Sequence, residues 1–313
     1  MSIDLKIFSG SANPQLAQSI CHALGLGLSQ LEISRFSNDN LFVQILENVR
    51  EKDVFIVQPF TAPVSDTIME LFIVLDALRS ASARRITAVI PYFSYARSDK
   101  KDAPRISITG RLVADLIKAA GANRVLTMDL HSDAVHGFFS IPVDHLTAVP
   151  YFVDYFHERL DLANAVVVAT DAGGAKRAGR FAGQIHLPMA IIDKRRVADT
   201  EVVQGLVVGE VRGRDAIIFE DEIATGGTLV ASVKTLAGRC HRDEARQRPG
   251  GCFGKTRYSL RHRGRRPLAP QNHRSHGRRR SRGLGPVINT HQTQRDRQTL
   301  CVCTRRDPCI LPP

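Results

Sequence analysis

The sequence predicts an α/β fold with largely parallel sheets, and three observations lead to that prediction. Short apolar segments alternate with amphipathic segments of helical periodicity over residues 1–238. Acidic residues or a glycine-rich turn directly follow several apolar segments, at the place where open α/β sheets bind their ligands. No apolar run approaches the length that spans a bilayer, so we expect a cytoplasmic protein with no membrane partner.

The predicted elements follow one another along the chain as a βα series requires. In the first half, apolar runs predict strands and amphipathic segments predict helices, at 4–8, 53–57 and 86–90 for strands and 14–24, 66–79 and 108–119 for helices. In the second half, strands are predicted at 124–128, 166–169, 188–192 and 216–219, and helices at 149–159, 174–184 and 228–237. Two βα series meet near 142–147, which predicts one domain at 1–145 and a second at 146–238.

The pattern ends at residue 239, where arginine, proline, glycine, histidine and cysteine become frequent together. Residues 239–313 hold 18 Arg and one Lys against four acidic residues, so their net charge of +15 leaves −3 for the rest. We expect this segment to be a basic, disordered tail without helix or strand periodicity. Either it binds nucleic acid through phosphate contacts, or it is translated in a shifted reading frame and the second domain is truncated. We favour the frameshift, because the pattern breaks in the middle of a domain.

The stretch 216–228 (AIIFEDEIATGGT) combines the groups that a 5-phosphorylated ribose needs. An apolar strand ends in Glu220 and Asp221, whose carboxylates can accept hydrogen bonds from ribose hydroxyls. The turn 225–228 (TGGT) then leads into a helix, and backbone N–H groups at a helix N-terminus bind phosphate. The alternative is an ordinary turn between strand and helix with a surface pair of carboxylates.

With three further segments, this stretch resembles the ribose-phosphate pyrophosphokinase family, which makes phosphoribosyl pyrophosphate (PRPP). Those segments are PYFSYARSDKK at 91–101, RVLTMDLHSDAVHGFF at 124–139, and VVVATDAGGAKRA at 166–178 with IIDKRR at 191–196. The resemblance covers residues 3–237 and implies two phosphoribosyltransferase-like domains. It also implies a reaction in which the C1 hydroxyl of ribose 5-phosphate attacks the β-phosphorus of ATP, giving PRPP and AMP. A homo-oligomer, a hexamer built from dimers, is implied as well.

The resemblance assigns roles to individual residues. It implies Mg²⁺ as cofactor with His131 and Asp171 as ligands, and Lys194 and Arg196 as catalytic residues on a mobile loop that extends to residue 203. The implied ribose 5-phosphate site comprises Glu220, Asp221, Ala224, Thr225, Gly226, Gly227 and Thr228. The implied ATP site comprises Phe36, Asn38, Asp39, Asn40, Arg97, Ser98 and Asp99.

The chain departs from the family pattern at several of these positions. The family usually has F-x-D-G-E where this chain has FSNDN at 36–40, so two carboxylates become amides. Ser98 stands where glutamine is common, Glu220 where aspartate is usual, and Ala224 where the residue is often acidic. An amide donates as well as accepts hydrogen bonds, so adenosine binding can survive with altered strength.

Three other functions compete with the kinase. A non-catalytic regulatory subunit would fit the amides and a damaged second domain, but Lys194, Arg196, His131 and Asp171 argue against it. A phosphoribosyltransferase that consumes PRPP would leave the first domain without a role. The third function is nucleic-acid binding, which would rest on the tail alone. We expect no nucleic-acid partner, because the net positive charge of the chain lies entirely in that tail.

Overall fold

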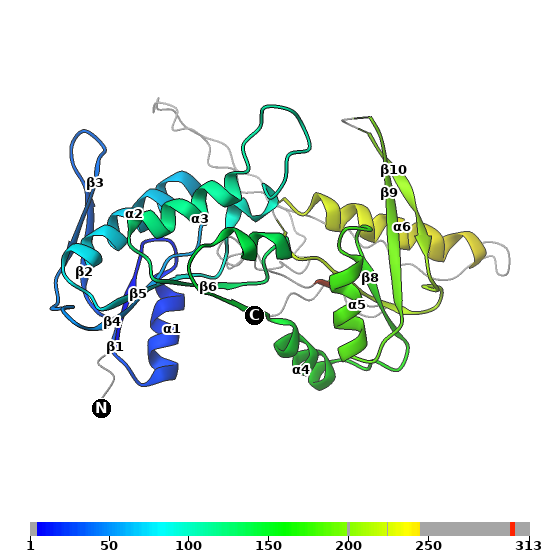
Figure 1. Ribbon diagram of the computed structural model, residues 1–313. Coiled ribbons are helices and arrows are strands. Elements are labelled where there is room, and N and C mark those ends of the chain that lie inside the picture. The colour runs from blue at the N-terminus through cyan, green and yellow to red at the C-terminus, as the bar shows by residue number, and fades with distance from the viewer. Residues whose placement is uncertain (1–4, 199–200, 224, 245–300, 304–313) are drawn as a thin grey trace, which may run out of the picture.

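The computed structural model describes residues 5–198, 201–223, 225–244 and 301–303, and it contains two five-stranded sheets flanked by helices (Figure 1). The predicted α/β fold with largely parallel sheets is confirmed. All the predicted strands and helices are present. The predicted strand at 188–192 continues to Ala198, and the predicted helix at 228–237 continues to Glu244.

The first sheet is entirely parallel, with strand order β1-β4-β5-β6-β7. Its strands are β1 (Leu5–Ser9), β4 (Asp53–Val57), β5 (Arg85–Ile90), β6 (Arg124–Met128) and β7 (Val143–Leu146). Helix α1 (Pro14–Leu24) covers one face, and α2 (Val64–Ser80) and α3 (Thr109–Ala120) cover the other (Figure 1). Short 3₁₀ helices η1 (Ser94–Arg97) and η2 (Asp133–Phe138) follow β5 and β6.

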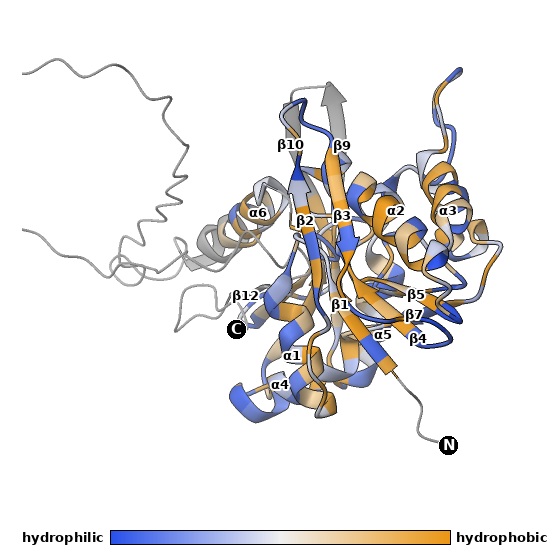
Figure 2. Cartoon of the chain, turned by 90° about the vertical axis from the view of Figure 1, so that its left-hand side faces the viewer, coloured by the Kyte–Doolittle hydropathy of each residue, from blue (hydrophilic) through white to orange (hydrophobic). Residues whose placement is uncertain are grey.

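Apolar side chains fill both faces of this sheet, and hydrophobic residues mark its strands and the helices packed on them (Figure 2). Leu71, Leu75 and Leu78 recur at helical spacing along α2, and all three are fully buried against the sheet. Burial of such a side chain contributes about 1.5–3 kcal/mol. The periodicity that predicts α2 from the sequence is therefore also what holds it on the sheet.

Two strands at 31–45, absent from the sequence prediction, form an antiparallel hairpin. Strands β2 (Leu31–Arg35) and β3 (Leu41–Ile45) pair only with each other and stand out from the first sheet (Figure 1). Their residues are half-buried or exposed, so they lack the continuous apolar run that reveals the central strands. The prediction also lacks β7, whose pattern VDHL is equally mixed.

The second sheet has strand order β10-β9-β8-β11-β12, with β8, β9 and β11 parallel. Its strands are β8 (Ala165–Ala169), β9 (Met189–Ala198), β10 (Glu201–Val208), β11 (Asp215–Phe219) and β12 (Cys301–Cys303). Helices α4 (Val149–Arg159) and α5 (Ala175–Gln184) pack on one face through Phe156 and Phe181, whose ring centroids lie 5.9 Å apart. Helix α6 (Gly227–Glu244) packs on the other face.

In two segments of this half the structure describes elements beyond the predicted ones. The described residues of the segment expected as a mobile loop at 194–203 lie on the arms of an antiparallel hairpin, in which β9 and β10 satisfy each other's backbone hydrogen bonds. The tail does contain regular structure within the described residues, because α6 continues to Glu244 and β12 pairs antiparallel with β11. Strand β12 occupies the edge of β11 that faces away from β8, where unpaired backbone groups would otherwise be left.

Candidate active site

Loops from both sheets meet between the two halves of the molecule. A cavity of about 300 Å³ is lined from both sides, by residues that include Asp129, His145, Phe152, Arg177, Glu220 and Asp221. These loops follow β6 and β11 at the carboxyl ends of parallel strands, which is where open α/β sheets bind ligands. We call His131, Thr170, Asp171, Arg177, Glu220 and Asp221 the inter-sheet cluster.

Asp221 is the centre of the cluster and is only 7% exposed. Its Oδ2 lies 2.5 Å from His131 Nδ1 and 3.1 Å from a terminal nitrogen of Arg177. Burial alone would raise the pKa of this carboxyl, but the hydrogen bond from His131 and the Arg177 charge outweigh burial and lower the pKa to about 2. Asp221 is therefore an ionised acceptor throughout the physiological range.

Glu220 has the opposite electrostatic environment. Burial raises the pKa of its carboxyl above the ordinary value, and the charges of Asp221 and Asp171 raise it further. Thr170 Oγ1 donates a hydrogen bond of 2.5 Å to Glu220 Oε2, which works against that rise. Two neighbouring carboxyls are thus driven apart in pKa, a pattern that is common at functional sites.

Tertiary contacts fix the turn that carries His131. Asp129 has a φ of +43°, and its carboxylate accepts a hydrogen bond from the Ala148 N–H at 2.9 Å. Leu130 N–H donates to His145 Nε2 at 3.0 Å, and Arg177 donates to the His131 carbonyl oxygen. Burial lowers the pKa of His145, which keeps its ring neutral and able to accept. His131 is therefore held by its own backbone as well as by Asp221.

The cluster suits a divalent cation that receives few protein ligands. Asp221 engages Nδ1 of His131, so Nε2 is the nitrogen that would bind a metal, as carboxylate-oriented histidines commonly do. Asp171 adds carboxylate oxygens, one of which accepts from Gly174 N–H at 2.8 Å. Among the described residues, no three His, Cys, Asp or Glu side chains come together as a metal site. A cation here would take most of its ligands from water and phosphate, as Mg²⁺ does.

The glycine-rich turn leads into α6 as the sequence predicts. Gly226 has a φ of +76°, a conformation that glycine adopts without strain, and α6 begins at Gly227. Gly227 N–H donates weakly to Thr225 Oγ1 at 3.4 Å, and Thr225 and Thr228 are exposed. Ala224 lies outside the described residues. The N-terminus of an 18-residue helix thus follows the two carboxylates after a short turn.

The residues expected to bind ATP are divided between two places. Arg97 and Ser98 lie at η1, and Arg97 Nε reaches Glu222 at 3.0 Å. Ser98 Oγ accepts from Thr109 N–H at 3.1 Å at the start of α3, so this hydroxyl is already engaged. Asp99 follows in the same half-buried loop.

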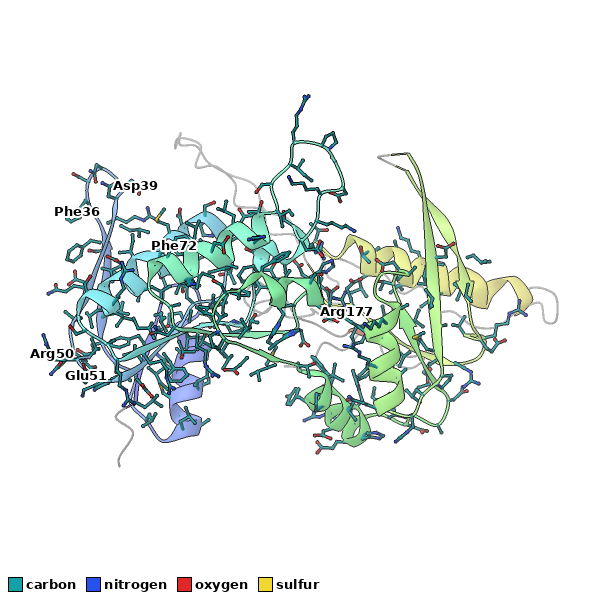
Figure 3. All side chains as sticks on the ribbon, in the orientation of Figure 1. Phe36, Asp39, Arg50, Glu51, Phe72 and Arg177 are labelled. Carbon is teal, nitrogen blue, oxygen red and sulfur yellow. The ribbon has the colours of Figure 1, made fainter. Side chains whose placement is uncertain are left out.

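The other ATP candidates, Phe36, Asn38, Asp39 and Asn40, lie at the β2–β3 turn. Figure 3 shows Phe36 and Asp39 at the outer end of this hairpin, far from Arg177. Phe36 is 57% exposed, and Asp39 pairs with Arg35 at 3.0 Å. Within one chain, the structure does not bring these residues to the inter-sheet cluster.

For Lys194 and Arg196 the structure describes only the backbone, which belongs to β9; their side chains lie outside the described part. Conversely, sequence reasoning missed Arg177, Tyr92 and Glu222, each of which contacts another residue of the site. Arg177 bridges His131 and Asp221, and Tyr92 and Arg97 both contact Glu222. Arg177 could have been found by its place in the first turn of the helix that follows the glycine-rich loop at 172–174.

Comparisons with known proteins identify relatives of both halves. Residues 5–121 match the family model of the N-terminal domain of ribose phosphate pyrophosphokinase, and residues 152–240 match that of the phosphoribosyl transferase domain. Neither match extends beyond residue 240, close to the point where the charge pattern changes.

Individual relatives agree with the family models. The ribose-phosphate pyrophosphokinase of Deinococcus radiodurans is 55% identical over 230 residues, which are 73% of this chain and 72% of the relative. The ribose-phosphate pyrophosphokinase of Gloeobacter violaceus is 49% identical over 233 residues, 74% of this chain and 70% of the relative. The crystal structure of phosphoribosylpyrophosphate synthetase from Mycobacterium smegmatis superposes with a TM-score of 0.71 at 39% identity, covering 75% of this chain and 77% of that one.

Proposed function

The chain belongs to the ribose-phosphate pyrophosphokinase family, and from that membership we propose how its residues transfer the pyrophosphoryl group of ATP to ribose 5-phosphate. The family is one of transferases that need a divalent metal. In the reaction, the C1 oxygen of ribose 5-phosphate forms a bond to the β-phosphorus of ATP. The bond from that phosphorus to the oxygen that bridges it to the α-phosphorus breaks, AMP leaves with this oxygen and the electron pair, and the proton of the C1 hydroxyl passes to water.

Ribose 5-phosphate binds between the two acidic residues and the start of α6. Asp221, ionised and held by His131 and Arg177, accepts hydrogen bonds from the ribose hydroxyls together with Glu220. The 5-phosphate binds the backbone N–H groups of 225–228, at the positive end of the α6 dipole. The single observation that carries this assignment is the position of Asp221, whose carboxylate lies 2.5 Å from His131 Nδ1 and 3.1 Å from Arg177 on the loop that leads to the anion-binding turn.

We propose Mg²⁺ as the divalent metal, and His131 Nε2 and an oxygen of Asp171 would hold it. It would supply positive charge to neutralise the polyphosphate. The contribution of the chain is to orient His131, through Asp221 at Nδ1 and through the Leu130–His145 hydrogen bond. Arg177 completes this support from the other sheet.

Lys194 and Arg196 are the catalytic cations. Phosphoryl-type transfer needs stabilisation of developing charge rather than covalent participation by the protein. Lys and Arg both supply such charge, and Arg can contact two phosphate oxygens at once. Their strand β9 is parallel to β8, so the chain that carries them runs toward the same end of the sheet as Asp171.

A homo-oligomer completes the ATP site. The β2–β3 hairpin carries Phe36 and Asp39 away from the inter-sheet cluster of its own chain (Figure 3). These residues can contact ATP only if a second copy places its hairpin against the cluster.

We propose a cytoplasmic location, which fits the single cysteine of residues 1–238, Cys21, being free and buried. No helix among the described residues is long and apolar enough to cross a membrane.

A catalytically weak regulatory subunit is a second candidate, and one observation favours it. Similarity to the family ends near residue 240, and the 230 residues matched in the Deinococcus relative are 72% of its length. A measurement of AMP release from ATP and Mg²⁺, with and without ribose 5-phosphate, separates the two. We expect release that depends on ribose 5-phosphate and falls at least tenfold in Asp221→Asn. Folded protein without such release would support the regulatory subunit.

A further inference from the structure

Glu222 connects the two halves of the molecule directly. Its Oε1 accepts a hydrogen bond of 2.7 Å from the Tyr92 hydroxyl, and its Oε2 lies 3.0 Å from Arg97 Nε. Tyr92 and Arg97 follow β5 in the first sheet, whereas Glu222 follows β11 in the second. A residue next to the ribose 5-phosphate candidate Asp221 is therefore bound to an ATP candidate 125 positions earlier in the chain.

The environment of Glu222 makes this contact well defined. The Glu222 side chain is 12% exposed, and both carboxylate oxygens have partners, so its position is fixed. The Arg97 side chain is 51% exposed. Glu222 holds it by Nε, which leaves the two terminal nitrogens for another anion. A small cavity beside Glu222 is lined by Tyr92, Arg97, His131 and Asp221 together.

We propose that Glu222 is a positioning residue, which orients Arg97 toward the polyphosphate of ATP. The inference rests on the proposed function for the identity of the two ligands. Glu222 touches neither ligand itself and acts through Arg97.

Stability does not explain a carboxylate at this place. Taking Glu222 out of water is unfavourable, and an ion pair with a half-exposed arginine contributes little to the stability of the fold. An apolar side chain of similar volume would avoid this desolvation cost, although the Tyr92 hydroxyl would lose its hydrogen bond to Oε1. The contribution that an apolar residue cannot make is to fix the direction of the Arg97 guanidinium.

The test compares Glu222→Met, which keeps the length and volume, with Glu222→Gln, which keeps an acceptor oxygen but not the charge. We expect Glu222→Met to weaken ATP binding about tenfold, as the loss of a hydrogen bond to a charged group predicts, and Glu222→Gln about threefold. The KM for ribose 5-phosphate should stay within twofold. Calorimetry with a non-hydrolysable ATP analogue and Mg²⁺ measures binding without turnover.

A double-mutant cycle with Arg97→Ala decides whether Glu222 acts through Arg97. In the Arg97→Ala background, Glu222→Met should have no further effect on the affinity for the ATP analogue. An unchanged or increased affinity in Glu222→Met, or an equal loss in both backgrounds, would overturn the proposal. Equal losses for ATP and ribose 5-phosphate would also overturn it, because they would indicate a general disturbance of the loop.

Two further results keep the test decisive. If Glu222→Met does not fold, Tyr92→Phe replaces it, because it removes only the hydroxyl that supports Oε1; a loss of about threefold in ATP affinity is expected. If the unaltered chain binds the ATP analogue but releases no AMP with ribose 5-phosphate, the proposed function fails. The binding cycle then still accepts or rejects the role of Glu222.

Discussion

Replacement of Asp221 by asparagine should destabilise the protein by an amount that depends on pH. The pKa of Asp221 is about 2 in the folded chain against 3.8 for a free carboxyl. At about 1.4 kcal/mol per pH unit, this difference corresponds to about 2 kcal/mol. Because the folded pKa is depressed, the stabilisation is fully present above pH 3.8 and is lost as the pH falls from 3.8 toward 2.

Part of this stabilisation is offset by Glu220. The Asp221 charge helps to raise the pKa of Glu220, so removal of that charge reduces the cost of ionising Glu220 in the folded chain. A net loss of about 1–2 kcal/mol at pH 7 is therefore expected for Asp221→Asn, measured by urea unfolding. Asp154→Asn on α4, an exposed aspartate outside the cluster, is the matched control and should change stability by less than about 0.5 kcal/mol.

The dependence on pH is the sharpest part of this test. The difference between Asp221→Asn and the unaltered chain should be constant from pH 7 to pH 5 and should shrink below pH 4. A difference that stayed the same down to pH 3 would show that the loss reflects packing rather than charge. An asparagine variant as stable as the original at pH 7 would refute the electrostatic account of the cluster.

Three further predictions concern other parts of the site and the tail. Glu220→Gln should stabilise the protein at pH 8 more than at pH 4, because burial raises the pKa of Glu220 and its ionisation above pH 4.5 disfavours the folded state. An equal change in stability at both pH values would contradict this prediction. The same variant should lower kcat/KM for ribose 5-phosphate about tenfold. Lys194→Ala should lower kcat about 100-fold or more with an unchanged urea midpoint, and a variant with normal kcat would exclude Lys194 from catalysis. Correction of the reading frame near codon 238 should raise soluble yield and kcat, whereas unchanged values would favour the tail as it stands.

Local pattern is enough to predict the elements that form the centre of each sheet. The run AVVVA of β8 is fully buried, and a continuous apolar run between turns is what a central parallel strand requires. Helix α3 follows from its apolar stripe, and its end follows from Gly121, which has a φ of +127°. In these elements the local pattern and the tertiary environment require the same residues.

Elements whose partners are distant in the sequence could not be predicted in the same way. The strands β2 and β3 are defined by pairing with each other, since neither is a continuous apolar run. Strand β12 depends on the free edge of β11, about 80 residues earlier in the chain. The local sequence of β2, β3 or β12 does not indicate which strand each will pair with.

The same division applies to the site. Asp221 was found because it ends an apolar strand before a glycine-rich turn, which is a local signal. The hydrogen bond from Leu130 to His145 and the bridge from Arg177 to Asp221 join segments that the sequence does not connect. The contact of Glu222 with Tyr92 and Arg97 is of this kind as well. Sequence reasoning finds the groups that bind ligands more readily than the groups that orient them.

The most direct test of the central claim is ³¹P NMR of the products formed by the unaltered chain from ATP, Mg²⁺ and ribose 5-phosphate. A pyrophosphoryl transfer predicts equal amounts of AMP and a ribose carrying a diphosphate at C1 and a phosphate at C5. The ATP β-phosphorus should appear in that diphosphate. Formation of ADP with a singly phosphorylated acceptor, or of AMP and free pyrophosphate without a new sugar diphosphate, would contradict the account.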